Sequence, residues 1–153
     1  MRLWLVAAIV GFAISVFTKM LADFFLPQSV SIVGAWLRLD YALNPGLAFG
    51  VVLSPLLQYI LIGSAFIAIL WFLPQWSRCP LCSIGTGLIL GGGLANLLDR
   101  LRDGVVTDFI VLWPLPHYNV ADTNIALGAL FLVLGEWGLP LPRKALAVFA
   151  GKW

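Results

Sequence analysis

Long hydrophobic runs alternate with shorter mixed segments along this chain. The first run, Leu3–Phe25, carries Lys19 and Asp23 as its only charged residues. The second begins at Pro55, a favourable residue for the first turn of a helix, and ends before Pro74. Because about 20 apolar residues let a helix cross a bilayer, the pattern predicts four transmembrane helices. We expect them at residues 3–25, 54–73, 84–98 (the core of the third span) and 120–139.

Two mixed segments separate these runs. Residues 27–53 are too polar to cross a bilayer and too apolar to float free in water, so we expect them on the membrane surface. Within them, residues 30–39 have the Val, Ile and Trp content that is typical of short strands. Residues 100–119 form the second segment. The predicted fold is an all-α membrane protein with four transmembrane helices and a small extracytoplasmic β-containing cradle between helices 1 and 2.

The composition supports a membrane protein and excludes other classes. Of 153 residues, 61% are hydrophobic and only 10% are charged, whereas about 25% are charged in an ordinary soluble domain. Disordered chains have the opposite composition. The net charge of +2 comes without a basic stripe, so we expect no nucleic-acid partner. The length predicts one membrane-embedded domain over residues 1–153.

The distribution of Lys and Arg predicts the orientation. Cytoplasmic loops are enriched in these residues, and one set of helix ends carries five of them against three on the other. Both termini are therefore expected in the cytoplasm and both mixed segments outside it. The five are Arg2, Arg78, Arg143, Lys144 and Lys152, and the three are Arg38, Arg100 and Arg102.

Acidic residues gather at the outer ends of the third and fourth helices. Four of the seven acids lie within 24 residues, namely Asp99, Asp103, Asp108 and Asp122. Two carboxyl groups close together cannot both ionise easily, so the pair shares one proton. One then acts as general base on a water molecule while the other donates a proton to a carbonyl oxygen, as in aspartic proteases. This chemistry needs no metal and no other cofactor.

Four sequence blocks occur in order at the predicted helix boundaries. They are Asn-Pro-Gly-Leu-Ala-Phe-Gly at 44–50, Gly-Gly-Gly-Leu-Ala-Asn-Leu-Leu-Asp-Arg at 91–100, Gly-Val-Val-Thr-Asp-Phe at 104–109, and Tyr-Asn-Val-Ala-Asp at 118–122. Together they resemble the lipoprotein signal peptidase family (signal peptidase II), whose members are four-helix aspartyl endopeptidases of the bacterial inner membrane. Any one block is a weak signal, but four in this order are a strong one.

The resemblance implies a reaction and a set of site residues. The family cleaves prolipoproteins after diacylglyceryl modification, on the N-terminal side of the lipidated cysteine. A diacylglyceryl-modified prolipoprotein and membrane lipid are therefore the implied partners, and we expect a monomer. Asp108 and Asp122 match the family's catalytic aspartates. Residues that would bind or orient the substrate or the two aspartates are Lys19, Asn44, Gly46, Asn96, Asp99, Arg100 and Asn119.

Two positions depart from the family's pattern. The family has an aspartate four residues before its first-helix lysine, and this chain has Ser15 there. Asp23 lies four residues after Lys19, at an equal distance along a helix, so we predict that Asp23 pairs with Lys19. Ala95 stands where the family prefers Gly. These departures keep open an alternative, a catalytically impaired homologue that binds lipoproteins.

A second alternative is a small four-helix proton-coupled transporter, because carboxylates in membranes also relay protons. Such a protein needs a carboxylate near the middle of the bilayer, whereas the acids here gather at one face. We therefore prefer the peptidase.

The remaining polar residues have simpler interpretations. Asp122 is placed to be the N-cap of the fourth helix, a role that is compatible with catalysis. His117 is expected at the membrane interface, near the cleft. Cys79 and Cys82 are expected as two reduced thiols in the loop before the third helix. A zinc ion there would need a second pair of ligands from another chain.

Overall fold

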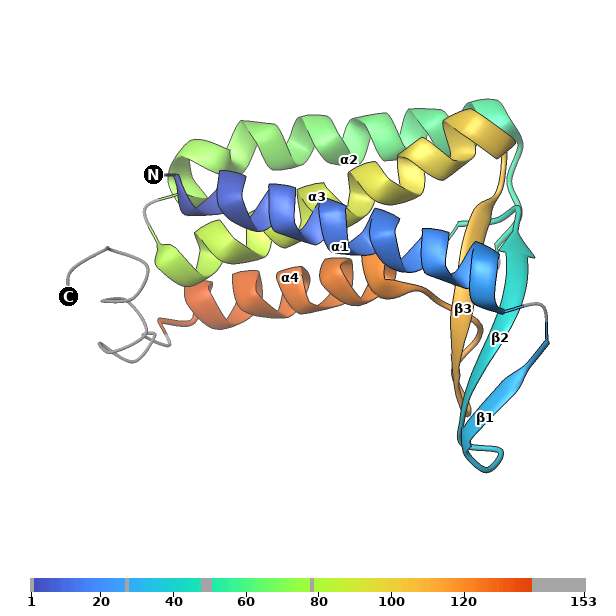
Figure 1. Ribbon diagram of the computed structural model, residues 1–153. Helices are drawn as coiled ribbons and strands as arrows, with labels where there is room; N and C mark the ends of the chain where they lie inside the picture. Colours follow the sequence, from blue (N-terminus) through green and yellow to red (C-terminus); the bar gives the residue numbers. More distant parts are fainter. Residues whose placement is uncertain (1, 27, 48–50, 78, 139–153) are drawn as a thin grey trace.

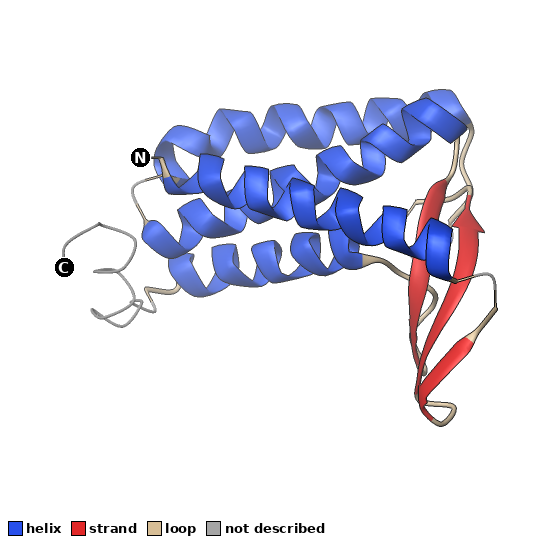
Figure 2. Ribbon diagram, viewed as in Figure 1, coloured by secondary structure: helices blue, strands red, loops and turns tan. Residues whose placement is uncertain are grey.

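A bundle of helices carries a small sheet at one end (Figures 1 and 2). The computed structural model describes residues 2–26, 28–47, 51–77 and 79–138. Within these ranges the helices are α1 (Leu3–Phe25), α2 (Pro55–Trp76), α3 (Pro80–Asp103) and α4 (Val120–Glu136). The strands are β1 (Val30–Val33), β2 (Leu37–Asn44) and β3 (Val106–Leu112).

Helix α3 is the central element of the bundle, and it packs closely on α1 and α4. Glycines make the close approach possible, because a Cβ at Gly87 or Gly91 would collide with backbone carbonyl oxygens of α1. A Cβ at Gly92 would collide in the same way with α4. In a lipid environment, such small residues replace the hydrophobic effect as the basis of helix association. Helix α2, by contrast, buries a single residue, Gln58.

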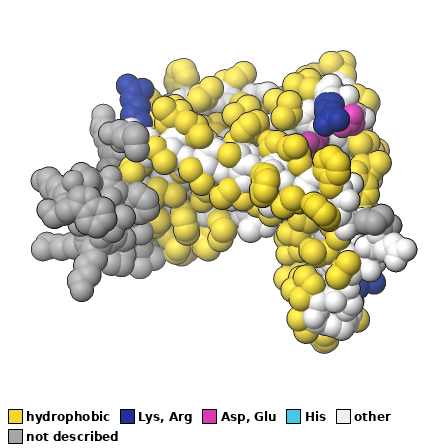
Figure 3. Space-filling model, viewed as in Figure 1, with side chains coloured by type: hydrophobic (Ala, Val, Ile, Leu, Met, Phe, Trp, Pro, Cys, Tyr) yellow, Lys and Arg dark blue, Asp and Glu magenta, His cyan; other side chains and the backbone are white. Residues whose placement is uncertain are grey.

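The outer surface of the bundle is apolar, and charged side chains lie toward its two ends in the view of Figure 3. Helices α1, α2 and α3 are each long and apolar enough to cross a membrane. Helix α4 has 17 described residues, and the predicted end of its span at Leu139 lies outside the described residues. Four basic residues of the orientation argument also lie outside them, so the orientation stays a prediction: Arg78, Arg143, Lys144 and Lys152.

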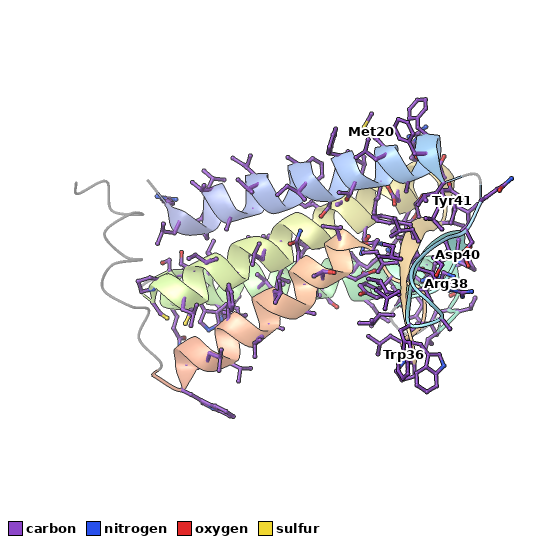
Figure 4. The ribbon with its side chains drawn as sticks, turned by 60° about the horizontal axis from the view of Figure 1, so that its bottom comes forward. Met20, Trp36, Arg38, Asp40 and Tyr41 are labelled. Carbon is purple, nitrogen blue, oxygen red and sulfur yellow. The ribbon has the colours of Figure 1, made fainter. Side chains whose placement is uncertain are left out.

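The sheet is antiparallel with the order β1-β2-β3, and it extends away from the bundle (Figure 1). Strands in residues 30–39 were expected, and β1 and β2 confirm them. The third strand was not predicted. The expected cradle lay between helices 1 and 2 alone, whereas β3 comes from the segment between α3 and α4. Pairing of Ala42 with Asp108 and of Asn44 with Val106 brings the two mixed segments together. Figure 4 shows Trp36 at the far tip of the sheet, where its ring meets that of Trp113 edge-on at 5.0 Å.

Two predicted helix boundaries were wrong. Helix α2 continues through Pro74 to Trp76, because a proline in the last turn removes only one backbone hydrogen bond near the end. Helix α3 begins at Pro80, so Cys82 lies inside its first turn and not in a loop. Proline is well suited to the first helical position because its missing N–H has no partner there in any case.

Candidate active site

The polar residues singled out from the sequence meet where the bundle joins the sheet. Helix α1 contributes Lys19, β2 and the turn after it contribute Asn44 and Gly46, and β3 contributes Asp108. The other five come from α3 and from the start of α4: Asn96, Asp99, Arg100, Asn119 and Asp122. Hydrogen bonds connect all nine, directly or through one another.

Asp108 is a buried carboxyl group held by two amide donors. Its side chain is 2% exposed. Asn44 Nδ2 donates to one carboxylate oxygen at 2.9 Å, and Asn119 Nδ2 donates to the other at 2.7 Å. Burial raises the pKa of Asp108 above its ordinary value, the hydrogen bond from Asn44 opposes this rise, and the charge of Asp122 adds to it. The net effect favours the protonated form of Asp108.

Asp122 belongs to a capping box at the start of α4. The N-cap is Asn119, not Asp122 as predicted, and Asp122 occupies the third helical position. Asn119 Oδ1 accepts the Asp122 backbone N–H at 3.0 Å, and Asp122 Oδ2 accepts the Asn119 backbone N–H at 3.1 Å. The other Asp122 oxygen accepts Asn96 Nδ2 at 2.8 Å. The cap therefore orients the carboxylate while leaving it partly accessible.

Asn119 connects the two aspartates. It is fully buried and donates its side-chain amide to Asp108 while its backbone N–H donates to Asp122. The same amide also lies 3.2 Å from Asn96 Oδ1 and 3.2 Å from the Thr107 carbonyl oxygen. Because one residue contacts both carboxylates, the spacing of the pair depends on how the first turn of α4 sits against β3.

Lys19 does not pair with Asp23, which corrects the prediction. Its ammonium group donates to Asp99 Oδ2 at 2.7 Å and to Asn96 Oδ1 at 2.7 Å. Lys19 is 4% exposed, whereas Asp23 lies on the outer face of α1. Helical spacing pointed to Asp23 as a neighbour of Lys19, but it carries no information about the other helices, and the packing of α1 on α3 brings Asp99 to Lys19 instead. Ser15, which stands where the family has an aspartate, accepts a hydrogen bond from Asn124 of α4 at 3.0 Å.

Arg100 ties α3 to the turn that follows β2. Its Nη2 donates to the Gly46 carbonyl oxygen at 2.6 Å, and its Nη1 donates to the Asn96 carbonyl oxygen at 3.1 Å. Its buried Nε has no hydrogen-bond partner among the described residues.

Sequence reasoning missed two residues of α2 that support this turn. Gln58 Nε2 donates to the carbonyl oxygens of Pro45 and Leu53, each at 2.9 Å. Tyr59 donates its hydroxyl to the Arg100 carbonyl oxygen at 2.9 Å. The signal was present, because a glutamine inside an otherwise apolar membrane helix needs a polar partner.

A cavity of about 830 Å³ opens beside the two aspartates. Apolar side chains of α2, α3 and α4 line most of it, including Ile62, Phe66, Ile89, Ile125 and Leu130. Its polar lining is concentrated at the end where Asn44, Asn96, Arg100, Asp108, His117 and Asp122 lie.

His117 lies in the cavity wall, and its Nε2 is 3.4 Å from Asp40 Oδ2. Figure 4 shows Asp40 on β2, between Arg38 and Tyr41. The expectation that His117 lies near the cleft is therefore confirmed. Among the described residues, no group of three or more His, Cys, Asp or Glu is placed to hold a metal ion.

Comparisons with known proteins identify the family. The family model described as signal peptidase (SPase) II matches residues 7–137, so the chain belongs to that family. The chain is 37% identical to the lipoprotein signal peptidase of Chlorobium luteolum, with 88% of this chain and 90% of the relative covered. It is 35% identical to the lipoprotein signal peptidase of Moorella thermoacetica, with 91% and 93% covered.

Solved structures share the fold. Two structures, each described as a bacterial membrane enzyme, superpose on this chain with TM-scores of 0.80 and 0.78. Both are 20% identical in sequence; the first covers 88% of this chain and 87% of its own, and the second 89% and 93%. This chain therefore shares the arrangement of helices and sheet of those two structures.

Proposed function

We propose that this protein is an aspartic endopeptidase that removes the signal peptide from diacylglyceryl-modified prolipoproteins. The observation that supports it most is a pair of aspartates, Asp108 and Asp122, bridged by Asn119 at the polar end of an apolar cavity. A water molecule is the nucleophile, and no cofactor takes part.

The different burial of the two aspartates suggests how they divide the work. Asp108 is almost fully buried with a raised pKa, so it holds the shared proton and donates it to the scissile carbonyl oxygen. Asp122 is partly exposed and acts as general base on the water. Asn44, Asn96 and Asn119 keep the two carboxyl groups in place. Arg100 lines the cavity, and its bond to the Gly46 carbonyl oxygen holds the turn after β2 against α3 beside the two aspartates.

The cavity walls suggest where the substrate lies. Helices α2 and α4 present apolar side chains along the cavity, which suit a hydrophobic signal peptide and acyl chains. The substrate enters sideways from the bilayer, and its scissile bond reaches the two aspartates at the extracytoplasmic face. The enzyme is a single domain and a monomer of the bacterial inner membrane, with four spans and both termini in the cytoplasm. The names of the curated relatives, which are lipoprotein signal peptidases, support the choice of a prolipoprotein substrate.

The impaired homologue and the transporter remain the competing functions. The Ser15 departure is compensated, because Lys19 has partners in Asp99 and Asn96 without an aspartate at position 15. Ala95 is fully buried against its neighbours without displacing Asn96 from Asp122. These observations favour an active enzyme over the impaired homologue.

A cleavage assay on the purified protein with a diacylglyceryl-modified prolipopeptide tests the proposal. Asp108→Asn and Asp122→Asn are each expected to lower kcat by at least about 10³-fold, because each removes one half of the acid–base pair. Asp103→Asn is the matched control, since this exposed acid lies outside the cluster and pairs with Arg102 at 3.6 Å. Near-normal turnover by either dyad variant would refute the assignment. An inactive wild-type protein that still binds the lipopeptide would establish the impaired homologue, and proton-coupled flux in liposomes would establish the transporter.

A further inference from the structure

Two cysteines at the N-terminal end of α3 have no part in the proposed peptidase. Cys79 is the N-cap of the helix, and Cys82 lies in its first turn. Cys82 is fully buried and Cys79 is half-buried. They lie at the opposite end of the bundle from the sheet (Figure 1).

The two sulfur atoms meet in the space left by a glycine of α4. A Cβ at Gly135 would collide with Cys82 Sγ and would lie 2.9 Å from Cys79 Sγ. The backbone N–H of Cys82 also donates to Cys79 Sγ at 3.2 Å. Both thiols therefore occupy the same side of one helical turn, against the same backbone position of α4. Cysteines three residues apart in one turn are within reach of a disulfide after a small side-chain rotation.

We propose that Cys79 and Cys82 form a redox-active dithiol that undergoes exchange with low-molecular-weight disulfides. The Cys79 thiolate attacks a disulfide R–S–S–R, forms a mixed disulfide and releases one thiolate, RS⁻. Cys82 then attacks the Cys79 sulfur while its proton passes to the departing sulfur, which forms the Cys79–Cys82 disulfide and releases the second group as RSH. The dithiol gives up two electrons, and the external disulfide is reduced to two thiols.

The geometry assigns different roles to the two cysteines. Cys79 is the more accessible, and a thiolate there accepts the Cys82 N–H at the positive end of the helix dipole. Cys82 is closed off from solvent and lies beside the Cys79 sulfur at Gly135, as a resolving cysteine does. A zinc ion is a poorer occupant, because two thiolates leave it about two ligands short.

This site is separate from the two aspartates. Asn96 lies fourteen residues after Cys82 along α3, which corresponds to about 21 Å of helix. The inference therefore does not depend on the proposed function, and Cys79→Ser and Cys82→Ser are expected to leave prolipopeptide cleavage unchanged.

Oxidation of the full-length protein in detergent micelles by glutathione disulfide tests the proposal. The reaction is stopped with acid, free thiols are alkylated with a maleimide, and the intact mass is measured. The wild type is expected to end as an intramolecular disulfide with neither a glutathione adduct nor a maleimide adduct. Cys82→Ser is expected to accumulate one glutathione adduct, because no resolving thiol remains. Cys79→Ser is expected to react at least about tenfold more slowly than Cys82→Ser, since its remaining thiol is buried.

Three results would overturn the proposal. The first is a wild type that carries two glutathione adducts, and the second is a wild type that keeps both thiols free after prolonged incubation with glutathione disulfide. The third is an equal rate of reaction with glutathione disulfide for the two serine variants. Purification with one tightly held zinc ion per chain or per pair of chains would instead assign a metal site. Unchanged cleavage by both serine variants confirms that they fold, and it distinguishes failure of this inference from failure of the peptidase assignment.

Discussion

The two ends of α3 are stabilised in opposite ways. At the end near the sheet, buried polar side chains such as Asn96 and Arg100 hydrogen-bond to α1, α4 and the turn after β2. Toward the other end, Gly85 and Gly87 let the backbones of α4 and α1 come close, and Cys82 fills the space beside Gly135. At the end near the sheet, hydrogen-bond donors and acceptors determine how the helices pack; at the other end, the close fit of small residues determines it.

This difference shows why the chemistry lies where it does. A buried charge in a membrane protein is tolerable only when its neighbours satisfy it, so the polar groups of several elements must meet in one place. The glycine-rich region, which contains Gly85 and Gly87, needs no such meeting of polar groups and holds the helices together by close backbone contact. Perturbing the polar end should therefore affect activity and stability together, while perturbing the glycine-rich region should affect mainly stability.

Breaking the buried ion pair is the most severe test of the polar end. Lys19→Met is expected to lower the free energy of unfolding by about 3 kcal/mol, because it leaves Asp99 without its buried partner. Unfolding in mixed micelles measures the change. In double-mutant cycles, Lys19→Met should couple to Asp99→Asn by about 1–3 kcal/mol and be additive with Asp23→Asn to within about 0.5 kcal/mol. The reverse pattern of coupling would restore Asp23 as the partner.

A methyl group is enough to test the glycine-rich region. Gly87→Ala is expected to cost about 2 kcal/mol of unfolding free energy, because its Cβ collides with the Trp4 carbonyl oxygen of α1. Gly63→Ala in α2 is the matched control, since a Cβ there meets nothing within 4 Å. The folded fraction of Gly87→Ala should retain near-normal kcat. Equal melting temperatures for the two variants would show that close helix contact is not what stabilises this region.

The stability of the polar end should depend on pH through Asp108. Folding raises the pKa of Asp108 above its ordinary value of 3.8. The protonated carboxyl group therefore stabilises the folded protein fully below pH 3.8, and this contribution to the free energy of unfolding is lost as pH rises through the raised pKa. Asp108→Asn lacks this titration. The melting temperature of Asp108→Asn minus that of the wild type should therefore increase from pH 4 toward neutral pH and then level off. A difference that is constant with pH would contradict the raised pKa.

The smallest expected effect is a shift of the pH profile. The hydrogen bond from Asn44 lowers the pKa of Asp108, so Asn44→Ala should raise that pKa further. If Asp108 is the acid, the alkaline limb of kcat moves to higher pH in this variant. Rates measured across pH 5–9 would detect the shift, with Asp103→Asn as control. An acid limb that moves to higher pH while the alkaline limb stays in place would exchange the proposed roles of the two aspartates.

Much of the site could be predicted from single residues and their order in the chain. The nine residues predicted for it all lie in one hydrogen-bonded cluster. Eight of them belong to the four sequence blocks, and the ninth, Lys19, is a charged residue inside an apolar helix. Local rules failed in two places. The i+4 spacing pointed to Asp23 as the partner of Lys19, but the packing of α1 on α3 brings Asp99 there instead. Asn119 and not Asp122 is the N-cap, because the Asn119 side-chain oxygen accepts the Asp122 N–H.

The sequence by itself determined that the chain is a membrane protein, where its main helices lie, and which acids gather at one face. Those properties follow from hydrophobicity and spacing along a single segment. Only the tertiary structure decided that β3 joins the sheet and places Asp108 opposite Ala42, that Lys19 bonds to α3, and that two thiols meet at Gly135. Each of these depends on how segments far apart in the chain approach one another, and a periodic pattern within one segment carries no information about that distance.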